Sequence, residues 1–315
     1  MLDFLYTVSE VFGMNYNYNL NRRPLTEVVC KHGSSKLFFT AIVLSIISTA
    51  LSLLYGIYSS VAALDTELPF VDLGPFLDDG YYITVIATVL ITVVNAILAF
   101  VQNGCLFSAY SFFSGKSRNG NGLINFSRVF LVQNILVIVE IPVLFLSFFA
   151  IVDDSYSFPG VWASIIFIMS IILIPIFAGL IVLSVFYYKG IKKSANHAMA
   201  AYENRNSGKV STFVLVMAFI SAVTVGFDII TALSSFGMVI FNAPTVTSVL
   251  ATLANVVVYG LMMASTIMYI VLIFRYKNDL ELAKQDWFYI EQQKAAIRAQ
   301  EYAASQQNSF NNGQF

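Results

Sequence analysis

The sequence predicts an all-α membrane protein with six transmembrane helices, both termini in the cytoplasm and a cytoplasmic C-terminal helix. Of its 315 residues, 58% are hydrophobic and 11% are charged, whereas a soluble protein carries about 25% charged residues. Six apolar stretches are long enough to cross a bilayer, which takes about 20 helical residues. All 17 Lys and Arg residues fall in alternate gaps between these stretches.

This composition excludes several classes of protein. A mean hydropathy of +0.75 is incompatible with a soluble enzyme, a disordered chain or a coiled-coil rod, because so apolar a surface would aggregate in water. The apolar runs are continuous rather than alternating, which favours helices over other ways to satisfy the backbone in lipid. The solvent of this chain is therefore expected to be lipid.

The elements follow in order along the chain. Residues 1–36 form a cytoplasmic N-terminal segment without the pattern of a cleavable signal peptide. Residues 37–278 form the transmembrane domain. Its expected spans are Leu37–Leu64, Tyr81–Phe113, Val129–Val152, Val161–Tyr188, Thr212–Phe241 and Thr247–Phe274.

The basic residues predict the orientation of these spans. They lie before the first span, between the second and third, between the fourth and fifth, and after the sixth. The opposite loops carry only acidic residues, such as Asp72 and Asp154, or no charge. Because Lys and Arg are retained on the cytoplasmic side, both termini are expected inside.

Residues 279–304 are rich in helix formers and are expected to continue as a cytoplasmic helix. Leu280, Trp287, Ile290 and Ile297 give it a narrow apolar stripe. Two interpretations stand: a solvated extension of the sixth span, or a helix that docks a protein partner. Acidic residues outnumber basic ones here, which disfavours an anchor on anionic lipid. Residues 305–315 are rich in Asn and Gln and are expected to be disordered.

Two carboxylates lie near the middle of predicted spans: Glu140 in the third and Asp228 in the fifth. A charged Asp at a helix centre costs about 2.5–3.5 kcal/mol on insertion scales, and no Lys, Arg or His lies within any span to neutralise it. With Asn95 of the second span, the two acids are the candidate transport or ion site. The expected polar path adds Ser221, Thr224, Thr231, Gln133 and Asn255, which lie on the same helix faces or at similar depth.

Catalysis has little support in the sequence. Two Cys and two His residues show no metal-ligand or nucleophile–base spacing, so we expect no metal, no cofactor and no catalytic residue. The first functional hypothesis is a transporter, channel or translocase subunit for a proton, cation or small solute. The alternative is a non-catalytic subunit that docks a partner through its C-terminal helix. The expected partners are the bilayer and a homo-oligomer or membrane complex, not nucleic acid.

Overall fold

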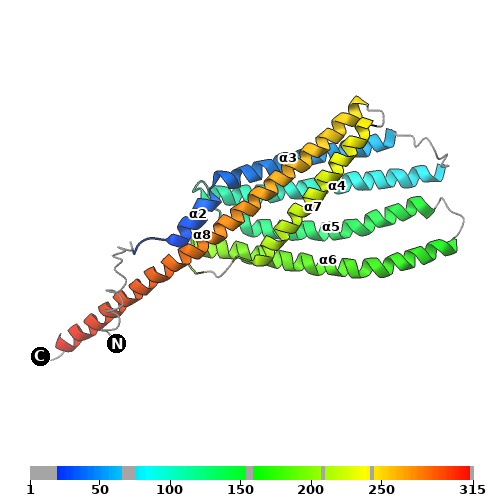
Figure 1. The fold of residues 1–315 in the computed structure, drawn as a ribbon. Helices are drawn as coiled ribbons and strands as arrows, with labels where there is room; N and C mark the ends of the chain where they lie inside the picture. Colours follow the sequence, from blue (N-terminus) through cyan, green and yellow to red (C-terminus); the bar gives the residue numbers. More distant parts are fainter. Residues whose placement is uncertain (1–19, 66–74, 154–158, 207–209, 242–244, 313–315) are drawn as a thin grey trace.

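A computed structural model of the chain describes residues 20–65, 75–153, 159–206, 210–241 and 245–312. Over these residues the protein is helical, without strands (Figure 1), which confirms the predicted class. A short helix, α2 (Pro24–Gly33), precedes the long ones. These are α3 (Lys36–Asp65), α4 (Pro75–Phe113), α5 (Gly122–Asp153), α6 (Pro159–Tyr202), α7 (Thr212–Phe241) and α8 (Val246–Asn312).

Each predicted apolar stretch lies within one long helix. Within the described residues, helical stretches in Pro24–Ser60, Ile86–Phe113, Thr212–Phe241 and Val246–Gln306 are long and apolar enough to cross a membrane. Their outward faces carry large apolar side chains; Phe227 on α7, for example, is 66% exposed. A patch of this extent indicates a lipid environment rather than water. The chain is therefore an integral membrane protein.

Four helix ends differ from the prediction, the first being that of α5, which begins at Gly122 rather than Val129. α4 begins at Pro75 rather than Tyr81, and α6 ends at Tyr202 rather than Tyr188. α8 is a single helix from Val246 to Asn312, so it joins the sixth predicted span, the predicted C-terminal helix and part of the 305–315 tail. Residues 313–315 of that tail and 1–19 of the N-terminal segment lie outside the described residues. The last part of α8 projects beyond the other helices (Figure 1).

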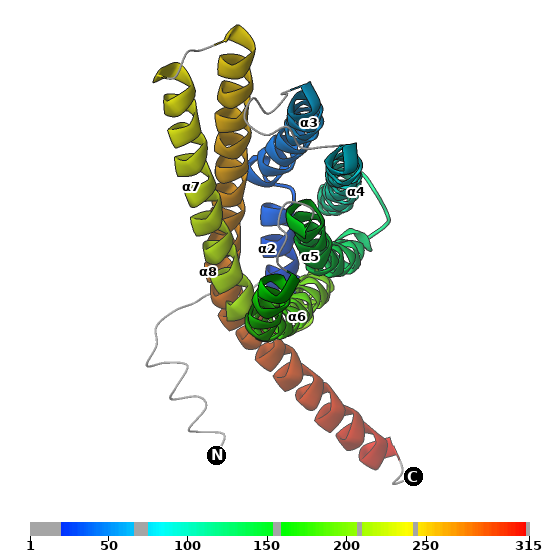
Figure 2. The same ribbon diagram turned by 90° about the vertical axis from the view of Figure 1, so that its right-hand side faces the viewer.

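The long helices pack in an order that differs from their order in the chain. α3 packs between α8 and α4, α7 packs on α8, and α5 packs between α4 and α6. Figure 2 shows the resulting curved row, α7–α8–α3–α4–α5–α6. α6 and α7 meet over a short stretch, where Phe186 and Tyr187 contact Phe213. The row thus brings α8, the last helix, against α3, the first long one.

At one end of the bundle, α2 packs against α8, α6 and α4. A group of buried residues, hereafter the neck cluster, joins these helices there. It comprises Leu25, Val29, Ala109, Phe113, Ala201, Val210, Leu280 and Ala283. α6 ends beside it in a left-handed residue, Asn204 (φ 56°), a conformation that Asn tolerates at a helix C-terminus. Burial of apolar side chains makes the neck cluster the structural joint of this end.

Candidate functional site

Two polar pairs link α4 to α5 inside the apolar bundle. The Asn95 side-chain Nδ2 donates a hydrogen bond to Glu140 Oε1 at 2.7 Å. Gln102 Nε2 donates to Gln133 Oε1. The helices come close because Gly122 has no side chain: a Cβ there would lie 2.6 Å from the backbone nitrogen of Ala109. The predicted site residues Asn95 and Glu140 are therefore direct neighbours.

The Asn95–Glu140 pair leaves hydrogen-bonding capacity unused. The Oδ1 atom of Asn95 is buried and has no donor among the described residues. Glu140 forms no ion pair within the described part of the chain. Glu140 is half-buried within a span, and a neutral amide partner leaves the charge of such a carboxylate uncompensated. Such a pair suits a proton or a small cation, which would supply the missing positive charge.

Asp228 belongs to a different group of helices. It lies half-buried on α7 and interacts electrostatically with Tyr259 of α8, which also interacts with Tyr55 of α3. No ion pair of the described residues includes Asp228. α5 and α7 are not neighbours in the packing row, so Glu140 and Asp228 occupy separate polar sites rather than one.

The other residues of the expected path lie in varied surroundings. Ser221, Thr224 and Thr231 of α7 are exposed in the single chain. The Thr224 and Thr231 hydroxyls donate to carbonyls one turn earlier, Ile220 and Phe227, as Ser and Thr commonly do in helices. Gln133 pairs with Gln102, and Asn255 is half-buried on α8. These residues are not brought together into one continuous cluster.

The stripe on the C-terminal part of α8 makes contacts within the chain. Leu280 and Ile290 are each 1% exposed, and Leu280 belongs to the neck cluster. The indole Nε1 of Trp287 donates to the Asn204 carbonyl at 2.9 Å. Ile297, further along, is 39% exposed. Leu280 and Trp287, two of the four residues expected to dock a partner, thus pack at the neck, Ile290 is buried within the chain, and Ile297 is partly exposed.

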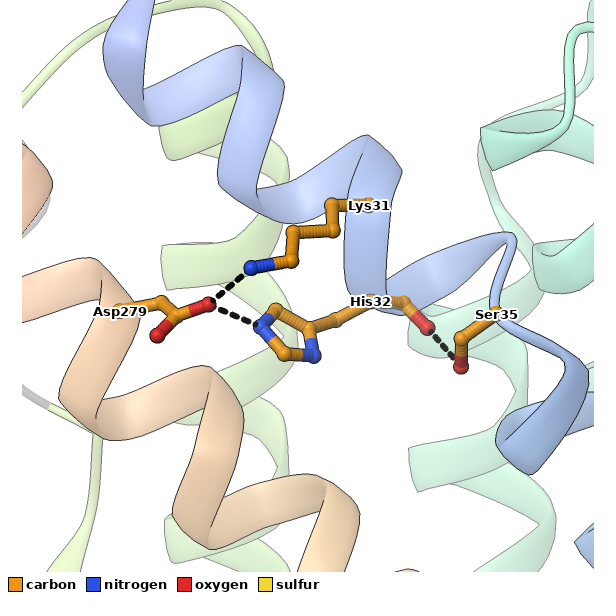
Figure 3. Close-up of polar contacts among 4 residues, drawn as sticks. All are labelled: Lys31, His32, Ser35 and Asp279. Atoms are coloured by element: carbon orange, nitrogen blue, oxygen red, sulfur yellow. Dashed lines mark hydrogen bonds and ion pairs between the residues drawn. The ribbon is translucent and has the colours of Figure 1, made fainter.

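A polar group at the neck was not anticipated from the sequence. Asp279 Oδ2 lies 2.7 Å from Lys31 Nζ and 2.9 Å from His32 Nε2 (Figure 3). His32 is 8% exposed, and its ring meets Tyr276 edge-on. Hydrogen bonds from Lys31 and then His32 hold the pKa of Asp279 below its usual value. Because His32 and Asp279 are 247 residues apart, no local sequence pattern connects them.

Among the described residues, no group of three or more His, Cys, Asp or Glu side chains could hold a metal ion. Comparisons with protein-family models, curated proteins and solved structures give no match for this chain. The arrangement of polar groups in the bundle and at the neck is therefore the basis for assigning a function.

Proposed function

We propose that this protein is a membrane transport protein, a transporter, channel or translocase subunit, that carries a proton, cation or small solute. The observation that carries the proposal is the Asn95–Glu140 pair, a mid-span carboxylate bonded to a neutral amide. The other acceptor of that amide is buried and unpartnered. Asp228, which interacts electrostatically with Tyr259, is a second acidic group in the part of the packing row away from α5.

The energetics support a functional role for these acids. Placing an ionised carboxylate within a span costs about 2.5–3.5 kcal/mol. A neutral amide offsets less of this cost than a cation would. If position 140 served packing alone, Gln would suffice there, just as Gln133 forms a side-chain hydrogen bond with Gln102. An acid at position 140 is useful when it binds and releases a proton or a cation.

The test is a flux measurement with the purified chain in proteoliposomes. One set of vesicles is loaded with a pH-sensitive dye and a parallel set with a sodium-sensitive dye. A potassium diffusion potential is then applied to both sets. We expect proton or sodium entry above the level of protein-free vesicles. Entry at the protein-free level for both ions would contradict a proton or cation path.

We further propose that the six predicted spans all cross the membrane, with both termini in the cytoplasm. The asymmetric placement of Lys and Arg supports this orientation. After replacement of Cys30 and Cys105, an impermeant thiol reagent added outside intact cells should label a cysteine at Asp72 or Asp154. It should not label one at Gly120 or Asn206 until the membrane is opened. The reverse pattern would refute the orientation.

The alternative function, a non-catalytic subunit of a membrane complex or a homo-oligomer, has one specific observation in its favour. Beyond the neck, α8 carries exposed apolar side chains, including Ile297 and Tyr302, on a helix that continues to Asn312. Purification in mild detergent separates the two functions. A stoichiometric partner together with absent flux would favour the subunit, whereas flux by the isolated chain favours transport.

A further inference from the structure

Two buried tyrosine hydroxyls on α8 lack partners. The OH groups of Tyr269 and Tyr276 are shielded from solvent and make no hydrogen bond to a described residue. Leaving a buried hydroxyl unpaired is unfavourable, because the group loses its hydrogen bonds to water. Buried water is the usual partner of such groups, since one water can bond several polar atoms at once.

These hydroxyls belong to a continuous polar line on α8. Ser265, Tyr269, Tyr276 and Asp279 are separated by four, seven and three residues, spacings that place them on one helix face. We call this line the α8 seam. It faces α3 and α2, because the Ser265 hydroxyl donates to the Ala41 carbonyl at 3.0 Å. In addition, Tyr269 packs on Phe38 and Tyr276 packs on His32.

The seam has a titratable group at its neck end. There the buried His32 shares Asp279 Oδ2 with Lys31 (Figure 3). Imidazole exchanges protons near neutral pH, which suits an entry point for protons. The proposed orientation places this end in the cytoplasm, and the 31% exposed side chain of Asp279 gives solvent access.

Further hydroxyl groups lie on α3 and α8 beyond Ser265. Ser48 of α3 is 4% exposed and lies on the helix face of Ala41 and Phe38, which packs against α8. Further along α8, Tyr259 interacts with both Asp228 and Tyr55. Hydroxyl groups therefore occur at intervals from the neck to the mid-span acid.

We propose that the α8 seam is a water-assisted proton route that leads from the His32–Asp279 pair, past the Tyr276 and Tyr269 hydroxyls, toward Asp228. The route rests on the proposed transport function. Tyr269 and Tyr276 lie about 10 Å apart along the helix axis, so water bridges them. Each water and tyrosine oxygen accepts a proton on a lone pair and releases its own to the next, and Asp228 ends as the neutral acid. No bond other than O–H or N–H is made or broken.

The test uses Tyr269→Phe and Tyr276→Phe, which remove only the hydroxyl. In the dye-loaded proteoliposomes we expect each variant to slow proton entry by about tenfold, equivalent to ~1.4 kcal/mol. The detergent unfolding temperature should not rise. Tyr302→Phe is the matched control, because Tyr302 lies on the same helix but is 67% exposed, and proton entry should be unchanged. If the two hydroxyls are merely unpaired, the Phe variants would unfold at higher temperature and retain full proton entry, which would overturn the route.

A second measurement is independent of flux. Hydroxyl-radical footprinting marks side chains beside ordered water even when they are buried. We expect Tyr269 and Tyr276 of the full chain to be modified, and buried Phe38 to be spared. Unmodified tyrosines would overturn the route. Failure of the proposed function has a different signature, namely no proton entry by the unmodified protein, with Asp228→Asn causing no further change.

Discussion

Glu140→Gln is expected to abolish proton or cation flux, down to the level of protein-free vesicles, in a protein that still inserts and folds. Gln has nearly the same size as Glu, and its carbonyl oxygen can still accept the hydrogen bond from Asn95 Nδ2. What is lost is the group that binds and releases a positive charge. Asp228→Asn makes the same change beside Tyr259 and is expected to have the same effect.

A control variant should make the same Glu-to-Gln change at a position outside the bundle. Glu301→Gln is such a variant, because Glu301 lies on the exposed part of α8, and flux should be unchanged. Thermal unfolding in detergent should give an unchanged midpoint for Glu301→Gln. The midpoints of Glu140→Gln and Asp228→Asn should be no lower than that of the unmodified protein, because each substitution removes a mid-span acid. Full flux in both Glu140→Gln and Asp228→Asn would mean that the acids serve packing, and the transport proposal would lose its main support.

Much of the helical architecture could be predicted because lipid imposes simple rules. Backbone polar groups in lipid must pair within the helix, so apolar runs report helices directly. The spacing of polar residues is consistent with the α4–α5 pairing: Asn95 and Gln102 are seven residues apart, as are Gln133 and Glu140. In an antiparallel helix pair this equal spacing allows both polar pairs to form in one register.

Other features of the fold and the site could not be predicted from the sequence. The ends of α6 and α8 extend past the apolar runs because helix-forming polar residues continue a helix in water as readily as in lipid. The contact of His32 with Asp279 depends on α2 folding back beneath α8. The two mid-span acids lie on different helix pairs because α5 packs between α4 and α6 whereas α7 packs on α8.

In the C-terminal part of α8, the effects of contacts within the chain can be distinguished from those of contacts with a partner. Leu280→Ala and Ile290→Ala should each lower the unfolding free energy by about 2–5 kcal/mol, because each removes a fully buried side chain. Ile297→Ala should leave this free energy nearly unchanged, since Ile297 is 39% exposed. Thermal or denaturant unfolding in detergent measures all three.

Deleting residues 293–315 extends the comparison. This cut keeps Leu280, Trp287 and Ile290, and with them the contacts to the neck cluster and to Asn204. Stability should therefore be retained, whereas a partner or second copy bound through the exposed extension would be lost. Mass measurement of the purified particle decides this point: a smaller particle supports docking beyond the neck. A particle of unchanged composition would limit the role of the stripe to holding α8 against α2 and α6.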